Sequence, residues 1–182
     1  MPIAPSVRQS TINFDLQLKG NYFDELDGVK NDEFIWKADG FKFTDRTGTG
    51  AGQSNRFWYK RNLVIPYSEY ADLDLCSFST IDGGKGLGQD QLGLPISMSQ
   101  VTFLLIRNKL NGSNLVMGDH PDAPWTSLLT GTLSLPPGNF LIFQTRAVPG
   151  WESAVGTNQF LRLTPDGTDC TVDIYVAGRD LS

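Results

Sequence analysis

The sequence predicts an all-β protein, an antiparallel β-sandwich or jelly roll that forms a single domain with an extended N-terminal arm. Residues 98–178 contain short runs of aliphatic, aromatic and β-branched residues. Turn sequences separate these runs, among them Asn111-Gly112, Pro149-Gly150 and Pro165-Asp166-Gly167. The 19 glycines and 10 prolines agree with many short strands, and no helical pattern of comparable quality competes.

The composition is that of a globular protein with a net negative charge. The chain has 182 residues, of which 40% are apolar and 19% are charged, so it can bury a sizeable core. Its net charge of -5 argues against clamping a nucleic-acid backbone, and we expect no direct nucleic-acid partner. No apolar run approaches the ~20 residues that span a bilayer, and the N-terminus lacks a signal-peptide core. We therefore expect a soluble protein made in the cytoplasm, with no membrane partner.

The first part of the chain predicts an arm followed by a strand. Residues 1–10 contain two prolines and no periodicity, so they are expected to form the arm. Residues 11–18 alternate between apolar and polar, which predicts a half-buried strand. The predicted single domain therefore covers residues 11–182, with residues 98–178 as its most regular part. Phe34 to Phe43 form a second apolar stretch at strand spacing.

Two Gly-rich segments, Thr47–Asn55 and Thr80–Gly93, are predicted to be loops, and the second is longer than ordinary connections. Between them, residues 57–65 predict a strand that Pro66 ends, and residues 67–78 alternate again.

Three of the strands expected within residues 98–178 differ in whether one face or both faces are apolar. Residues 101–107 and 141–143 are apolar on both faces, which predicts central strands covered on both sides. The last strand alternates and predicts one buried and one wet face. Its inward positions are Cys170, Val172, Ile174 and Val176, and its outward positions are Thr171, Asp173 and Tyr175.

The single histidine is the first candidate for chemistry. His120 lies between Asp119 and Asp122 in a Pro-containing turn, so a metal site is conceivable, although an exposed loop is the simpler interpretation. A Ser-His-Asp hydrolase would need this same histidine, and no serine has the strand–turn–helix context.

Carboxylates and glycines give weaker signals. A glycosidase needs two carboxylates, and the candidates are Asp72, Asp74, Asp166, Asp169 and Asp173, although turns and wet edge strands also favour Asp. The Gly-rich segment 82–88 lacks the spacing of a phosphate loop, and the acidic segment 24–33 lacks that of a calcium loop. Asn111 matches a glycosylation acceptor but is better explained as a hairpin turn. No catalytic residue, metal ligand or cofactor is therefore predicted.

Cysteines and tryptophans complete the candidates. Cys76 and Cys170 are expected to be small buried residues, with a bridge between them as the alternative. Trp125 and Trp151 follow Pro124 and Gly150 in loops, where they could anchor an interface or pack into the core.

Over residues 59–178 the sequence also resembles a known family. The matching segments are Asp72 to Leu75, Asn114 to Gly118, Pro137-Gly138, Gly150-Trp151 and Ile174 to Gly178. In this order they resemble a family of small virion structural proteins of tailed bacteriophages, found among head and morphogenesis proteins. The resemblance implies no enzyme activity and no cofactor.

The expected function is therefore that of a non-enzymatic capsid decoration or cement protein. It would bridge capsid subunits through its arm and Gly-rich loops, with the major capsid protein or other virion subunits as partners. We expect a homo-oligomer, with a trimer favoured, on the capsid surface of a virion assembled in the host cytoplasm. The alternatives are a carbohydrate- or receptor-binding module of a tail fibre or spike and a small β-sandwich glycoside hydrolase. The candidate interface residues are Pro2, Ile3, Pro5, Val7, Arg8, Trp125 and Trp151.

Overall fold

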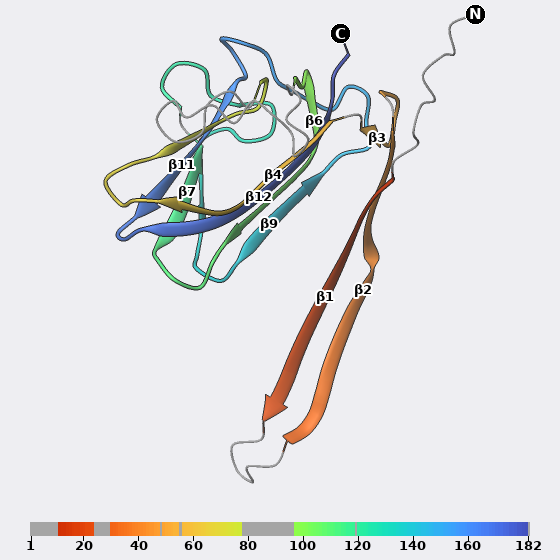
Figure 1. Cartoon of the computed structure of the whole chain (residues 1–182), viewed down its shortest axis with the longest axis vertical. Helices are drawn as coiled ribbons and strands as arrows, with labels where there is room; N and C mark the ends of the chain where they lie inside the picture. Colours follow the sequence, from red (N-terminus) through yellow and green to blue (C-terminus); the bar gives the residue numbers. More distant parts are fainter. Residues whose placement is uncertain are drawn as a thin grey trace, which may run out of the picture. The chain divides into compact units, whose positions relative to one another are not determined.

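The computed structural model of the chain describes residues 11–23, 30–47, 49–54, 56–77, 97–118 and 120–181 (Figure 1). These residues form strands and turns, and no helix occurs among them. The described part of the chain accordingly holds no helix that is long and apolar enough to cross a membrane. The chain divides into two units, Met1–Thr47 and Gly48–Ser182. The boundary between these units lies at the start of the first Gly-rich segment, and the single domain expected over residues 11–182 stays a prediction.

The first unit contains a long β-hairpin. Strand β1 (Thr11–Phe23) pairs antiparallel with strand β2 (Lys30–Thr47), and the register shifts between Asp15 and Gln17 and again between Tyr22 and Phe23. The strand expected at residues 11–18 is therefore present and continues for five more residues.

The described residues of the second unit form a sandwich of eight strands and two further two-residue strands, β3 (Gln53–Ser54) and β10 (Trp151–Glu152). One sheet has the order β4–β12–β6–β9 and the other the order β5–β11–β7–β8, with every pair antiparallel. The first sheet is formed by β4 (Arg56–Ile65), β12 (Cys170–Arg179), β6 (Gln100–Asn108) and β9 (Phe140–Gln144). The second is formed by β5 (Ala71–Asp74), β11 (Phe160–Asp166), β7 (Asn114–Gly118) and β8 (Thr132–Leu135).

The strand order distinguishes a jelly roll from other sandwiches, which the sequence could not do. The chain crosses between the sheets at β4–β5, β5–β6, β6–β7, β8–β9, β10–β11 and β11–β12, while β7 and β8 are neighbours in one sheet. Eight strands wound in this way form the double-sheet jelly roll. In Figure 1, β4, β12, β6 and β9 lie in one layer, and β7 and β11 lie in the other.

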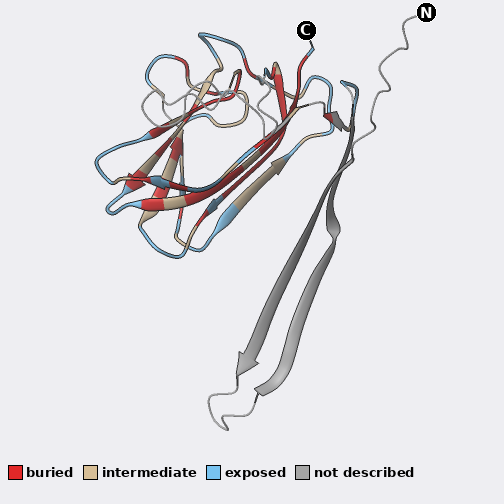
Figure 2. Cartoon of the chain, in the orientation of Figure 1, coloured by how far each residue is buried: buried red, intermediate tan, exposed pale blue. Residues whose placement is uncertain are grey.

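The core fills the space between the two sheets. Figure 2 shows buried residues along the strands and exposed residues mainly in the connecting loops. The four inward positions predicted for β12 are confirmed, since Cys170, Val172, Ile174 and Val176 are all 0% exposed. Strand β6 is central and buried on both faces, as predicted. Leu104 and Ile106 lie on the face that forms the core, and Phe103 and Leu105 are buried on the opposite face.

Two predictions about faces were wrong. Strand β9 pairs only with β6 among the described strands and is half-buried, so residues 141–143 form an edge strand rather than a covered central one. Asp173 was expected on the wet face of β12, but it is only 7% exposed. A register irregularity between Val172 and Ile174 lies at this position, and the Asp173 carboxylate bonds to the neighbouring strand.

Candidate functional site

The most developed polar cluster surrounds Asp72 at the edge of the second sheet. Arg162 on β11 lies directly opposite Asp72 on β5, and its Nε and Nη2 atoms donate to the two carboxylate oxygens at 2.8 and 2.9 Å. The Arg162 guanidinium also lies 3.7 Å from the centre of the Tyr70 ring. The hydrogen bond to Asp72 raises the pKa of Arg162 above its ordinary value. The Asp72 carboxylate is therefore paired with a permanently charged guanidinium, and this ion pair is part of the folded structure.

His120 approaches the same carboxylate. Its Nε2 atom lies 3.3 Å from Oδ2 of Asp72, and its ring stacks on Phe160 with centroids 4.4 Å apart. Its Nδ1 atom accepts the backbone N–H groups of Asp122 and Ala123, both at 3.2 Å. Both ring nitrogens are therefore used, and neither is left to bind a metal or to accept a proton from a serine. His120 thus fastens the 120–123 turn to β5.

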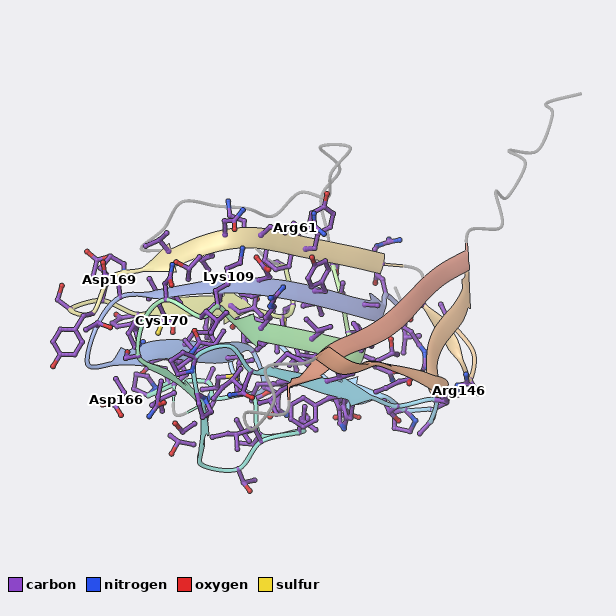
Figure 3. All side chains as sticks on the ribbon, turned by 90° about the horizontal axis from the view of Figure 1, so that it is seen from below. Arg61, Lys109, Arg146, Asp166, Asp169 and Cys170 are labelled. Atoms are coloured by element: carbon purple, nitrogen blue, oxygen red, sulfur yellow. The ribbon has the colours of Figure 1, made fainter. Side chains whose placement is uncertain are left out.

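Asp74 and Asp169, two of the other carboxylates considered from sequence, are also engaged in local structure. Asp74 is 1% exposed, and its oxygens accept from the Cys76 and Ser77 amides, the Ser77 hydroxyl and Gln159 Nε2. Asp169 accepts the amide of Tyr67 at 2.9 Å. Asp166 and Asp169 lie near one end of the sandwich and Arg146 near the other (Figure 3). Within the described ranges, no three His, Cys, Asp or Glu residues are grouped so that they could hold a metal ion.

Trp125 is a core residue, which corrects the expectation that it anchors an interface. It is 2% exposed, its Nε1 donates to the Glu152 carbonyl at 2.9 Å, and its ring meets Trp151 edge-on with centroids 6.3 Å apart. Its backbone N–H bonds to the carbonyl of Phe160, which draws this turn against β11. Trp151 also packs edge-on against Phe143. It is half-buried, which leaves part of its surface exposed.

An aromatic and basic surface lies on the side of the first sheet that faces away from the core. Tyr59 and Tyr175 are directly opposite each other on β4 and β12, and their rings stack with centroids 5.8 Å apart. Arg61 Nε donates to the Tyr175 hydroxyl at 2.7 Å, and this bond raises the pKa of Arg61. Tyr59 is 37% exposed, and Arg61 and Arg107 are exposed. We call Tyr59, Arg61 and Tyr175 the tyrosine platform.

A polar network lies beside this platform. Asn62 adopts a left-handed backbone conformation with φ of 55°, and its N–H donates to the Asp173 carboxylate at 2.9 Å. Lys109 bonds both to the Asn62 side chain and to Asp173, the latter at 3.3 Å. Figure 3 shows Arg61 and Lys109 near β4 and β12. This network fixes the bulged parts of β4 and β12 and thereby supports the tyrosine platform.

Several residues of these sites were not singled out from the sequence. Arg162, Tyr59 and Tyr175 acquire their roles from partners on other strands. Alternation along β11 does place Arg162 on the side opposite to Leu161 and Leu163, but its partner Asp72 is 90 residues away.

The cysteines are separate and buried. Cys76 follows β5 in the second sheet and Cys170 begins β12 in the first, and both thiols are free. The expectation of small buried residues is confirmed, and the alternative of a bridge is not. Burial raises the pKa of the Cys76 thiol to about 11, with a further contribution from Asp74.

The remaining sites expected from sequence lie outside the described residues. These are the arm residues Pro2, Ile3, Pro5, Val7 and Arg8, and the loop Thr80–Gly93. The structure therefore leaves their part in an interface as a prediction.

No family model matches the chain, and the searches of curated proteins and of solved structures return no match either.

Proposed function

We propose that the chain is a non-enzymatic structural protein of a virion, acting as a capsid decoration or cement protein. In this role it bridges capsid subunits through the arm at residues 1–10 and through its Gly-rich loops. Its partners are the major capsid protein or other virion subunits, and it acts on the capsid surface as a homo-oligomer, with a trimer favoured. The virion is assembled in the host cytoplasm.

The observation that carries this proposal is the engagement of the candidate catalytic groups in the fold. Arg162 and His120 hold Asp72, a turn surrounds Asp74, and both nitrogens of His120 are used. Groups fixed in this way stabilise a scaffold and do not present a reactive centre. Two further arguments agree with it: the sequence resembles small virion proteins over residues 59–178, and jelly rolls are common among viral capsid domains.

Removal of the arm tests the proposal. A variant that lacks residues 1–10 should lose binding to undecorated capsid shells, because the arm supplies surface that partners order and bury. The unfolding midpoint of the sandwich should stay unchanged, since the division of the chain after Thr47 separates the arm from the sandwich unit. Val155→Ser is a matched control, because this residue is 78% exposed in a turn of the sandwich and its substitution should leave capsid occupancy unchanged. Equal occupancy of the wild-type chain and the arm deletion would contradict the proposal.

The tyrosine platform favours carbohydrate binding as a second candidate function. Aromatic rings with a neighbouring guanidinium are suited to stack on sugar rings and to bond with their hydroxyl groups. Lectin domains also use the jelly roll. Tyr59→Ala should then abolish binding on a glycan array, whereas Tyr67→Ala, at a turn tyrosine that is 58% exposed, should not. Absence of any glycan signal from the wild-type chain would reject this function.

A further inference from the structure

Three reactive side chains of the first sheet meet at Lys109. Its Nζ atom contacts Oδ1 of Asn62 and lies 3.3 Å from Oδ1 of Asp173. The side chain of Asp173 is 10% exposed and that of Lys109 is 32% exposed, so the carboxylate and the amine are partly shielded from water. An amine, a carboxamide and a carboxylate are thus held together, and we call these three residues the lysine–asparagine cluster.

Backbone hydrogen bonds fix the position of each member of the cluster. Lys109 directly follows β6, and its N–H donates to the carbonyl of Thr171 at 2.9 Å. Asn62 lies on β4 with φ of 55°, and its N–H donates to the Asp173 carboxylate at 2.9 Å. Asp173 itself belongs to β12, which lies between β4 and β6 in the sheet. The contact of Lys109 with Asn62 therefore reaches across β12 and connects two strands that are not neighbours.

The cluster contains the groups that amide formation between two side chains requires. A lysine amine is a nucleophile once it has lost its proton, and the carbon of a carboxamide is an electrophile. Reaction needs the two groups in contact and a proton carrier beside them, and Asp173 lies beside the amine. Within the described residues, Nδ2 of Asn62 has no hydrogen-bond partner, so no bond retains this nitrogen as a leaving group. The nucleophile, the electrophile and the proton carrier are thus all in place.

We propose that Lys109 and Asn62 are joined by an intramolecular isopeptide bond, which forms once after folding with Asp173 as the proton carrier. Asp173 first accepts a proton from the Lys109 ammonium group. The neutral Nζ then attacks Cγ of Asn62, and the Nζ–Cγ bond forms while a second Nζ proton passes through the carboxyl group to Nδ2. The Cγ–Nδ2 bond breaks with its electron pair on nitrogen, which takes up the first proton and leaves as ammonium. Asp173 returns to its carboxylate form, and no oxidant or cofactor takes part.

The bond fastens a strand that otherwise has one neighbour. Among the described strands β4 pairs only with β12, and the bond ties it to β6 through residues 47 positions apart in the sequence. Cross-links that close long loops restrict the unfolded chain and so stabilise the folded one. This cross-link would resist reducing agents, in contrast to a disulfide, and both cysteines of the chain are free. It is independent of the proposed capsid role, and purified chain suffices to detect it.

Intact mass under reducing conditions tests the bond. The wild-type chain should be lighter than its sequence by one ammonia, and a digest should contain a branched peptide that carries both Lys109 and Asn62. Lys109→Arg keeps the charge beside Asp173, and Asn62→Gly suits the left-handed backbone, and each should restore the full mass. Lys60→Arg, on the same strand as Asn62, is the matched control and should keep the loss of ammonia.

Denaturing electrophoresis gives a second measurement of the same bond. The loop between residues 62 and 109 stays closed in a cross-linked chain even when the rest is unfolded. The wild-type chain and Lys60→Arg should therefore migrate ahead of Lys109→Arg and Asn62→Gly. Equal migration of all four chains would overturn the proposal.

Substitution of Asp173 tests its part in the reaction. Asp173→Asn and Asp173→Ala cannot carry the protons and should have the full mass, with near-ultraviolet circular dichroism reporting which of them is folded. A folded variant of either kind with the bond complete would overturn the role of Asp173. Full mass of the wild-type chain overturns the bond itself, whatever the Asp173 variants do. Loss of ammonia that persists in Lys109→Arg also overturns it, because the ammonia would then come from a different residue.

Discussion

Arg162 and Asp72 face each other across the pairing of β11 with β5, and two hydrogen bonds of 2.8 and 2.9 Å join the guanidinium to the carboxylate. Asp72 also bonds to His120, so this carboxylate connects the edge strand β5, the central strand β11 and the turn that contains His120. Bidentate pairs of this kind have fixed geometry and are stronger than single neutral hydrogen bonds. The cluster is therefore expected to stabilise one edge of the second sheet.

Replacement of Asp72 should measure this contribution. Asp72→Asn removes the charge and one acceptor facing Arg162, and we expect the free energy of unfolding to fall by about 1–3 kcal/mol. Urea unfolding followed by tryptophan fluorescence gives the value. Asp166→Asn, at an exposed position at the end of β11, is the control and should change stability by less than about 0.5 kcal/mol. Equal effects of the two substitutions would show that the pair contributes nothing beyond an exposed carboxylate.

The bonds of His120 predict which of its nitrogens carries the proton. Because Nδ1 accepts two backbone N–H groups and Nε2 faces Asp72, the proton should reside on Nε2. Long-range ¹H–¹⁵N spectra distinguish this tautomer at neutral pH. Added Zn²⁺ should leave the His120 signals unshifted, since both nitrogens are engaged. A proton on Nδ1, or a shift of these signals with zinc, would contradict the geometry.

Local signals allowed much of the jelly roll to be predicted. The strands β7, β8, β11 and β12 fall where turn residues bracket apolar runs, since turn chemistry acts over a few residues. The pairing of Arg162 with Asp72 was not predictable, because it depends on a register between segments about 90 residues apart. The same limit applies to the tyrosine platform, whose two rings belong to strands far apart in sequence.

Trp125 shows why burial is hard to predict in loops. It follows a proline and lies outside regular strands, so the sequence left both an interface position and core packing open. The structure buries it because its turn bonds to β11 and its ring fills the end of the core against Trp151. Strand periodicity gives no information about such a residue, because a loop has no fixed alternation of faces.

Trp125→Ala should consequently destabilise the sandwich. Removing a buried tryptophan leaves a cavity and costs about 3–5 kcal/mol, and it also removes the hydrogen bond to Glu152. The thermal midpoint by circular dichroism should fall clearly, whereas Tyr67→Ala at an exposed turn should leave it almost unchanged. A stable Trp125→Ala variant would mean that this ring does not hold the two sheets together.

Burial of the Cys76 thiol predicts a loss of stability in alkali. Its pKa is raised from 9.0 to about 11, because burial disfavours the thiolate. The contribution to stability is complete below about pH 9, where the thiol is protonated in both states. It is lost between about pH 9 and pH 11, because the unfolded chain releases this proton first. Unfolding of the wild-type chain and of Cys76→Ala, compared across this range, isolates the effect from the tyrosines. Parallel pH profiles would contradict it.

Gly178 predicts a strong steric effect at the bulge of β12. A Cβ atom there would lie 2.4 Å from the carbonyl oxygen of Gln100 and 2.5 Å from the sulfur of Met98, which is itself buried. Gly178→Ala must therefore shift the β6 backbone, and we expect it to cost about 1–3 kcal/mol or more, as overpacking does in well-packed cores. Gly156→Ala is the control: its φ of 78° imposes backbone strain of about 1–2 kcal/mol, but nothing lies within 4 Å of the added atom. Urea unfolding should rank Gly178→Ala as the more damaging change, and the reverse order would indicate that β6 and β12 can separate at this bulge without penalty.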